Sequence, residues 1–330
     1  MTTNLLFKKI AKQKIFILGD VMLDNYWFGF SDRMSPEAPV PIISLEKKES
    51  RLGGALNVAA NCIALGADTH ILSVIGKDED GKTLLNLCKR ENIRTKFILQ
   101  DAKRITTTKA RVISSEKHML RIDHEHTTKL ARALEHKFIN KCLKAIQIEK
   151  PDVIILQDYN KGVLTPAAIR NVIRHAKEVG CIVCVDPKRN NFFAYKEVDI
   201  FKPNLKEVKE GLELNKMITQ KTNLKKIHEQ LRDKLKHKIS FITLSEKGVF
   251  VQEDQNAQLY KAHKRKIVDV SGAGDTVIAV AALIYSAIRD KDLMAQIANL
   301  AGGLVCEELG VVTINSDKLK RAIKKANIET

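Results

Sequence analysis

The segment Val268-Asp269-Val270-Ser271-Gly272-Ala273-Gly274-Asp275-Thr276-Val277 joins a glycine-rich turn to the start of an apolar helical run. Glycine adopts positive φ at little cost, so this turn can bring several backbone N–H groups close to an anion. The following helix adds the positive end of its dipole. The segment therefore predicts a phosphate-binding turn around Gly272 and Gly274.

Asp275 lies at the mouth of this turn, and two interpretations of it stay open at this point. It could simply cap the helix. Alternatively, it could be the general base for an incoming hydroxyl group, because a carboxylate beside a bound phosphate repels it and is a poor structural choice there. The second interpretation makes the segment a centre for phosphoryl transfer.

Outward from this segment, β-rich and helical stretches alternate along the chain. Strands are expected at 14–18, 70–75, 153–156, 182–185, 198–201 and 239–244, and helices at 54–65, 81–90, 166–179 and 224–235. This alternation predicts an α/β fold with a mostly parallel sheet covered by helices on both faces. With 330 residues and 44% hydrophobic content, we expect one domain over residues 1–330.

Two stretches break the alternation. The stretch from about residue 24 to 50 is rich in turns and proline, and the stretch from about residue 103 to 123 alternates β-branched with polar side chains. Both predict extended ribbons, which together could form a small lid over the active-site edge and keep water from the phosphate. Ribbons leave sheet edges and an apolar face, so we also expect a homodimer through these strands.

Polar residues follow several of the predicted strands, at the edge where open α/β sheets bind ligands. Asp20 and Asp24 follow the first strand, and the diglycine Gly53-Gly54 with Asn57 opens the next helix. The diglycine alone could be only a tight turn. With the two carboxylates, however, it offers the donors and acceptors that a polyhydroxylated ligand requires. Later strand ends predict further substrate contacts at the same edge by Asp158, Lys161, Asp186 and Lys188.

The motif Asn204-Leu205-Lys206-Glu207 also has two interpretations. Asn204 can cap the helix that begins there. Glu207 could instead orient Mg²⁺ through water, because this ion keeps much of its hydration and needs few protein carboxylates.

The ribbon around residues 104–111 places Thr107, Lys109 and Arg111 on one face of a strand. They form either a solvated edge strand or a clamp for a phosphate already carried by the substrate.

The net charge of +17 could indicate nucleic acid, an acidic membrane surface or a lysine-rich proteome. Lysines are spread over 202–238 and 318–325 and mixed with acids, so we interpret the charge as a solvated surface that also attracts phosphorylated substrates. The sequence lacks a signal-peptide core or a run long enough to span a bilayer. Cys181 and Cys184 lie in an apolar run typical of a buried strand, which favours reduced structural thiols over a metal site. We expect a cytoplasmic protein that binds neither nucleic acid nor membranes.

These motifs resemble the ribokinase-like (PfkB) carbohydrate kinases. Asp-Val-Ser-Gly-Ala-Gly-Asp at 269–275, the diglycine at 53–54 and Asn-x-x-Glu at 204–207 follow the family's order and spacing. The likeness covers residues of about 10–315. Within the family, the chain most resembles the branch that phosphorylates the anomeric hydroxyl of a heptose 7-phosphate. Four segments carry this resemblance: Gly-Asp-Val-Met-Leu-Asp-Asn-Tyr-Trp at 19–27, Ser-Pro-Glu-Ala-Pro-Val-Pro at 35–41, Asp-Tyr-Asn-Lys-Gly-Val-Leu at 158–164 and Val-Asp-Pro-Lys at 185–188.

The resemblance implies ATP as donor, Mg²⁺, a heptose 7-phosphate as acceptor and a 1,7-bisphosphate as product. By matched position, Asp275 takes the proton of the sugar O1, and the backbone of Gly272, Ala273 and Gly274 forms the anion hole. The segment around Asn204 and Glu207 binds the nucleotide phosphates and the metal. The resemblance also implies that the adenosine part of ATP lies near Thr243, Ser245, Gly248 and Asn299. Lys206 departs from the small or neutral residue common in relatives, and either adds a phosphate contact or faces water.

Many relatives are fused to a nucleotidyltransferase with a His-x-Gly-His motif, which is absent here. We therefore expect this chain to leave nucleotidyl transfer to a separate protein. Two other functions remain open: a kinase of the same family acting on another sugar or sugar phosphate, and a basic nucleotide- or nucleic-acid-binding protein without catalysis.

Overall fold

The computed structural model describes residues 1–115, 117–214 and 220–330. Within these residues, nine strands form the main sheet. In spatial order they are β13 (Asn256–Tyr260), β12 (Val249–Glu253), β11 (Ile239–Thr243), β10 (Ile200–Phe201), β9 (Ile182–Asp186), β8 (Val153–Gln157), β1 (Lys14–Gly19), β4 (Asp68–Gly76) and β5 (Arg94–Asp101). The strands from β11 to β5 pair in parallel, whereas β12 and β13 are antiparallel additions at one edge. The predicted mostly parallel sheet is confirmed.

The central strands are buried on both faces, which explains why they are continuous apolar runs rather than alternating ones. On β1, Ile15 and Ile17 point into one hydrophobic core, and Phe16 and Leu18 point into the other. Each core is closed by its own layer of helices. The sheet is therefore the middle layer of a three-layer body.

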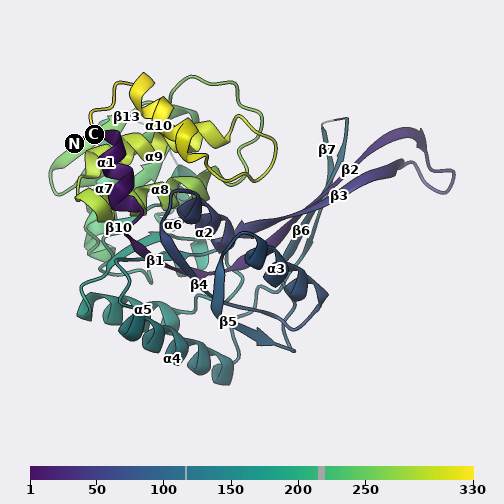
Figure 1. Cartoon of the computed structure of the whole chain (residues 1–330), viewed down its shortest axis with the longest axis horizontal. Helices are drawn as coiled ribbons and strands as arrows, with labels where there is room; N and C mark the ends of the chain where they lie inside the picture. The colour runs from purple at the N-terminus through teal and green to yellow at the C-terminus, as the bar shows by residue number, and fades with distance from the viewer. Residues whose placement is uncertain (116, 215–219) are drawn as a thin grey trace.

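One face is covered by α1 (Thr3–Ile10), α2 (Ala55–Ala64), α3 (Glu79–Arg90), α8 (Ala273–Ile288), α9 (Lys291–Val305) and α10 (Ser316–Lys325). The other is covered by α4 (Arg132–Glu149), α5 (Pro166–Glu178), α6 (Leu205–Gly211) and α7 (Lys221–Leu235). Figure 1 shows α4 and α5 together below the sheet and α8 and α9 above it. Short 3₁₀ turns occur at η1 (Arg189–Asn191) and η2 (Ser245–Lys247).

A second sheet, called here the lid sheet, contains β3 (Pro41–Gly54), β2 (Val21–Met34), β6 (Thr108–Ser114) and β7 (Lys117–His124). It extends away from the body as a long ribbon (Figure 1). The two predicted ribbons are thus confirmed, although residues 103–107 precede β6 as a connection instead of forming part of the strand. Large apolar side chains remain exposed on it at Phe30, Met34, Val40, Leu45, Met119, Leu120 and Ile122.

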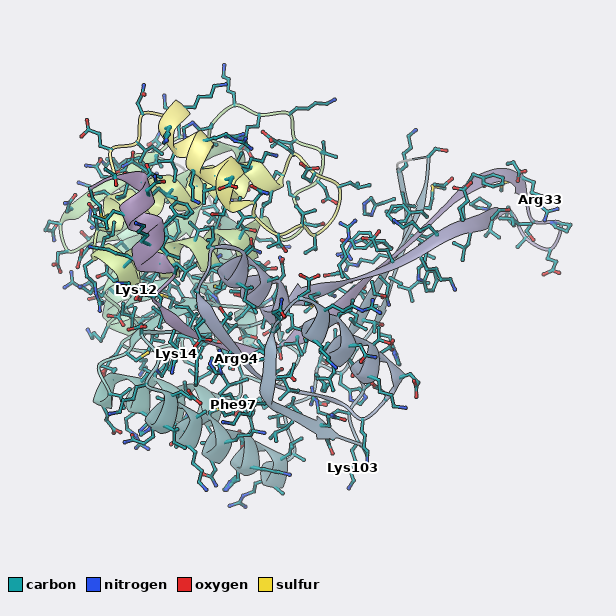
Figure 2. All side chains as sticks on the ribbon, in the orientation of Figure 1. Lys12, Lys14, Arg33, Arg94, Phe97 and Lys103 are labelled. Atoms are coloured by element: carbon teal, nitrogen blue, oxygen red, sulfur yellow. The ribbon has the colours of Figure 1, made fainter. Side chains whose placement is uncertain are left out.

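Figure 2 shows long side chains with nitrogen and oxygen ends mixed over the outside of the body, and Arg33 near the tip of the ribbon. All six cysteines are buried and unbridged. No helix in the described part of the chain combines the length and the apolar character needed to cross a membrane.

Candidate active site

Polar residues collect at the carboxyl edge of the main sheet because its parallel strands end in register. Gly19 at the end of β1 pairs with Gln157, and Gln157 pairs with Asp186 at the end of β9. Lys202 directly follows β10, which lies next to β9. The predicted convergence of the strand ends on one edge is therefore confirmed by the register.

Asp275 reaches this edge from the first turn of α8, and its carboxylate is buried. Its Oδ2 accepts a hydrogen bond from Asn57 Nδ2 at 2.9 Å. Its Oδ1 accepts two, from Gln157 Nε2 at 3.1 Å and from the Tyr159 hydroxyl at 2.6 Å. These partners are side chains of other elements, so the carboxylate does not serve as the cap of its own helix.

Burial raises the pKa of Asp275 to about 7, against the opposing effect of the hydrogen bonds from Tyr159 and Asn57. A carboxylate with a pKa near neutral pH is a much better proton acceptor than an ordinary surface carboxylate. It is ionised, and so able to take a proton, only above that pH. The geometry suits a general base.

The turn before α8 has the open backbone that the predicted anion hole requires, and phosphate binding there stays a prediction. Gly272 has φ +78°, and a Cβ there would lie 2.7 Å from Asn57 Nδ2. At Gly274 a Cβ would meet only Asp186 Oδ2 at 3.9 Å and Lys202 Nζ at 4.0 Å, so there is space beside its backbone. The Ala273 N–H donates to Val270 O at 3.3 Å, a long bond. First-turn N–H groups have no partner within their helix and remain suited to an anion.

A carboxylate and lysine cluster faces this turn. Lys202, which is buried, lies 3.0 Å from Asp186 Oδ2. Lys188 is paired with Glu207 and lies 3.9 Å from Asp186 Oδ1. Burial alone would lower the pKa of Lys188, but the carboxylates of Asp186 and Glu207 raise it, so this lysine stays charged.

Asn204 and Glu207 form a capping box at the start of α6. The Asn204 side chain accepts from Glu207 N, and Glu207 Oε2 accepts from Asn204 N, both at 2.8 Å. The capping interpretation of Asn204 is therefore confirmed. It leaves Glu207 Oε1 to Lys188, and burial together with Asp186 raises the pKa of Glu207.

This cluster fits a magnesium ion bound mainly through water and phosphate. Asp186 Oδ1 is buried without a hydrogen bond, and Glu207 provides a second carboxylate nearby. Mg²⁺ is commonly held by one or two carboxylates plus phosphate oxygens. No group of three or more His, Cys, Asp or Glu side chains that could hold a metal ion gathers within the described residues.

The residues assigned to the nucleotide differ in their placement. Lys206 is 85% exposed and lies 3.8 Å from Glu210, so it faces water and not the phosphate site. Thr243 ends β11 and bridges to Asn204, which brings it to the carboxyl edge. Ser245 begins η2 just beyond it and Gly248 follows η2, and Asn299 donates from α9 to Lys261 O at 2.9 Å. Their contact with adenosine stays a prediction.

Two of the carboxylates assigned to the substrate are occupied by the protein itself. Asp20 accepts the backbone N–H groups of Tyr159, Lys161 and Val163, and its burial raises its pKa to about 6. Asp158 accepts from the Tyr195 hydroxyl at 2.6 Å and from Asn191. These contacts hold the 158–163 loop in place, and direct binding of substrate by either carboxylate stays a prediction.

The base of the lid sheet contains a buried ion pair. Arg111 on β6 lies 2.5 Å from Asp24 Oδ1 on β2, and both side chains are buried. Gly53 permits this, because a Cβ there would lie 2.0 Å from Asp24 Oδ2. Gly54 lies next to it as the N-cap of α2. Arg111 is therefore already paired with a carboxylate of the protein itself, Asp24.

Two lysines that were predicted to contact the substrate, Lys109 and Lys161, meet where the lid joins the body. Lys109 lies 2.9 Å from Asp123 and 3.3 Å from Glu125, and Lys161 lies 2.6 Å from the other Glu125 oxygen. Glu125 therefore bridges a lid lysine and a body lysine. Thr107 is buried just before β6.

Sequence reasoning missed three residues of this site. Gln157 and Tyr159 bind Asp275, and Lys202 binds Asp186. Gln157 ends β8, Tyr159 follows two residues later, and Lys202 directly follows β10. Position at a strand end, taken for every polar side chain and not only for acids, could have found them.

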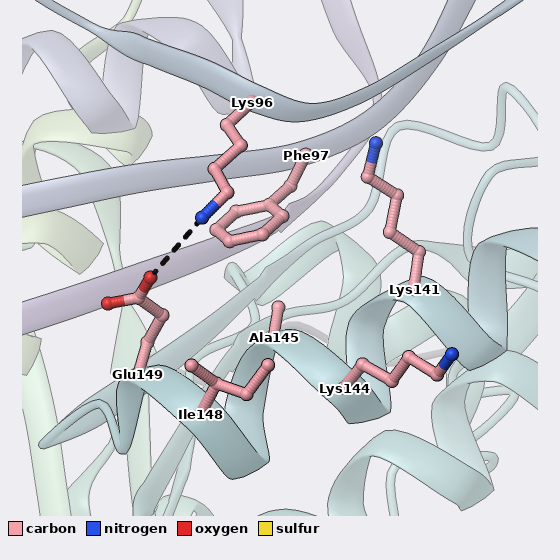
Figure 3. Close-up of a pocket in the computed structure, with 7 residues that line it drawn as sticks. All are labelled: Lys96, Phe97, Lys141, Lys144, Ala145, Ile148 and Glu149. Atoms are coloured by element: carbon pink, nitrogen blue, oxygen red, sulfur yellow. Dashed lines mark ion pairs between the residues drawn. The ribbon is translucent and has the colours of Figure 1, made fainter.

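The hollow in Figure 3 lies elsewhere, between β5 and α4, with a volume of about 270 Å³. Phe97, Ala145 and Ile148 form its apolar wall, and Lys96 lies 3.8 Å from Glu149 at its rim. None of the strand-end residues lines it, so it is separate from the active site.

A parallel sheet of this order, with its polar carboxyl edge beside a glycine-rich helix start and a lid sheet, is the ribokinase-like fold. The putative ribokinase from Agrobacterium tumefaciens has a similar structure, with a TM-score of 0.76 at 15% identity over 97% of this chain and all of that one. Phosphofructokinase-2 from Escherichia coli in complex with substrates and products gives 0.79 at 18% identity, over 95% of this chain and 99% of that one. At such identities the likeness shows the fold alone.

The chain belongs to the pfkB family of carbohydrate kinases, whose model matches residues 12–318. Among curated proteins it is similar to the bifunctional protein HldE of Campylobacter curvus, at 34% identity over 96% of this chain and 67% of the relative. HldE of Sulfurimonas denitrificans is 35% identical over 93% of this chain and 63% of the relative. The chain thus spans about two thirds of the length of these bifunctional relatives.

Proposed function

We propose that this chain transfers the γ-phosphoryl group of ATP to the anomeric O1 of D-glycero-β-D-manno-heptose 7-phosphate and releases ADP and the 1,7-bisphosphate. The observation that carries the proposal is Asp275: a buried carboxylate with a pKa of about 7, at the start of the glycine-rich helix. The identity with HldE proteins over nearly the whole chain supports the heptose over other sugars. This step would belong to the synthesis of lipopolysaccharide core precursors.

In the proposed reaction, Asp275 accepts the O1 proton while O1 attacks the γ-phosphorus and the bond to the ADP oxygen breaks. Backbone N–H groups at Gly272, Ala273 and Gly274 stabilise the charge that develops on the transferred group, and preorganised donors of this kind contribute about 3–4 kcal/mol each in other enzymes. Lys202 lies across from Gly274, and Lys188 lies near the same carboxylate, Asp186, so both would face the nucleotide phosphates.

Mg²⁺, when bound, would neutralise phosphate charge and orient the phosphate oxygens for in-line transfer. Asp186 and Glu207 would hold it, Glu207 through water. Lys109 and Lys161, joined through Glu125, would attract the phosphate already on the sugar. A phosphorylated acceptor fits these cations better than a free sugar does.

The apolar side chains on the lid sheet support a homodimer formed through the lid strands. The six buried, unbridged cysteines support a cytoplasmic location.

The proposal is tested by ADP formation from ATP and Mg²⁺ with a panel of heptose 7-phosphate, fructose phosphates, ribose and free heptose. We expect turnover with heptose 7-phosphate and at most weak turnover with the rest. Turnover with another sugar and none with heptose 7-phosphate would refute the specificity and keep the kinase class. No ADP with any acceptor would refute both.

A further inference from the structure

The two oxygens of the Asp275 carboxylate are not equivalent. Oδ1 accepts two hydrogen bonds, from Tyr159 and Gln157, and Oδ2 accepts one, from Asn57. A carboxylate oxygen has room for about two in-plane donors, so Oδ1 is filled and Oδ2 keeps one acceptor position. We propose that Tyr159 and Gln157 are positioning residues that occupy Oδ1 and thereby reserve Oδ2 for the proton of the acceptor hydroxyl. This inference rests on the proposed role of Asp275 as general base.

Tyr159 is held so that its hydroxyl has a fixed direction. Its backbone N–H donates to Asp20 Oδ2 at 2.8 Å, and its ring lies below Lys188 Nζ, 5.5 Å from the ring centre. Burial and the neighbouring Asp275 raise the pKa of the Tyr159 hydroxyl well above its ordinary value. The hydroxyl therefore stays protonated at neutral pH and remains a donor to Asp275.

Gln157 links the proposed base, Asp275, to Asp186. Its fully buried amide nitrogen donates to Asp275 Oδ1 and to Asp186 Oδ2, both at 3.1 Å. The opposite orientation of the amide would put its oxygen against two carboxylates, which fixes the assignment. Gln157 Oε1 is left buried without a hydrogen bond, an unfavourable arrangement that stability alone does not explain.

The test compares two buried tyrosines. Tyr159 and Tyr195 each donate a 2.6 Å hydrogen bond to a buried carboxylate, but the partner of Tyr195 is Asp158 and not Asp275. Tyr159→Phe keeps the ring beside Lys188 and removes the donor to the base. Tyr195→Phe removes a similar bond elsewhere and so matches it in its effect on folding.

For Tyr159→Phe we expect the acid limb of the kcat profile to move up by about one pH unit, because the ionised base loses a donor. At pH 7 kcat should fall about fivefold, while KM for ATP stays within about twofold. Asp186, Lys188 and Lys202, the charged groups that interact with Asp275, are unchanged in this variant. Tyr195→Phe should leave the limb in place, and Gln157→Met, similar in size but without N–H donors, should move it upward as Tyr159→Phe does.

Two outcomes would overturn the inference. One is an acid limb that is the same in Tyr159→Phe, Tyr195→Phe and the wild type. The other is a raised acceptor KM at unchanged kcat in Tyr159→Phe, which would make Tyr159 a substrate ligand.

A readout without turnover separates this inference from the proposed function. The carboxyl carbon of Asp275 can be titrated by NMR with ¹³C-labelled aspartate, and its signal is assigned by its loss in Asp275→Asn. We expect the titration midpoint to rise in Tyr159→Phe and to stay constant in Tyr195→Phe. Absence of turnover with every acceptor would refute the proposed function, and the titration would still decide the inference.

Discussion

Two equally buried carboxylates, Asp275 at the start of α8 and Asp24 at the base of the lid sheet, are satisfied in opposite ways. Asp24 is paired with a cation, Arg111, at 2.5 Å. Asp275 is held by three neutral donors from Asn57, Gln157 and Tyr159. A cation neutralises the charge of a carboxylate, whereas neutral donors orient a carboxylate and leave its charge in place, so that burial raises the pKa of Asp275. The ion pair of Asp24 with Arg111 holds β2 against β6, and the three donors around Asp275 orient the proposed base.

The largest effect should come from the base itself. Asp275→Asn keeps the shape of the side chain and removes the proton acceptor, so kcat should fall by about 10²–10⁴-fold at saturating substrates. KM values should change little. Steady-state kinetics with wild-type and mutant protein at pH 8 measure this, and a kcat within about threefold of wild type would exclude the base role.

Loss of the ion pair between Asp24 and Arg111 should instead lower the stability of the protein. Arg111→Met leaves Asp24 buried and unpaired, which should lower the free energy of unfolding by about 3–5 kcal/mol. Urea unfolding of wild type and mutant measures the loss. A mutant of normal stability with a raised KM for the sugar phosphate would instead favour Arg111 as a phosphate clamp.

The open space beside Gly274 should be essential to nucleotide binding and irrelevant to folding. In Gly274→Ala the added methyl group would lie 3.9 Å from Asp186 Oδ2, an ordinary contact, so thermal stability should be unchanged. A bound phosphate would collide with it, and such overpacking costs about 1–3 kcal/mol, so kcat/KM for ATP should fall about tenfold or more. Unchanged kinetics would move the anion hole away from Gly274.

The junction between lid and body should sense the phosphate on the sugar. Lys161→Met removes a cation beside Glu125, and KM for the phosphorylated acceptor should rise about tenfold. The same change should have little effect on a sugar without that phosphate. Equal effects on both acceptors would place the phosphate elsewhere.

The smallest effect is expected at the opposite edge of the body, where His228 and His237 both contact Ser240 Oγ. Burial lowers the pKa of His228 to about 4 and of His237 to about 3. The unfolded chain takes up these protons from about pH 6.5, so the free energy of unfolding should fall by roughly 1 kcal/mol from pH 7 to pH 6, and further toward pH 4. Urea unfolding at both pH values measures it. His228→Gln should reduce the dependence, and the exposed His136→Gln should not.

The body was more predictable from sequence than the lid, for a physical reason. Parallel strands share one carboxyl edge, so polar residues after Leu18, Leu156 and Val185 were bound to meet there, whatever the details of packing. On the ribbon, alternation gave the face of Lys109 and Arg111 but not their partners. Those partners, Asp24, Asp123 and Glu125, are set by strand pairing across distant segments.

Some of the site lay beyond the reach of sequence patterns. Gln157 is the last residue of an apolar strand and has no motif of its own, and its role depends on Asp275, 118 positions later. Asp20 followed the expected strand but is occupied by backbone N–H groups of a loop from elsewhere in the chain. Strand ends can be predicted from local sequence, whereas the partner of a buried side chain depends on the whole fold.

The central claim is that the Asp275 site transfers phosphate to an anomeric hydroxyl. Phosphorus NMR of the reaction with ATP, Mg²⁺ and heptose 7-phosphate tests it most directly. With wild-type protein we expect a new phosphate ester resonance that is coupled to the anomeric proton and grows in step with ADP, while the 7-phosphate is retained. With Asp275→Asn this resonance should be nearly absent over the same time. Inorganic phosphate without a new ester, or an equal rate in Asp275→Asn, would contradict it.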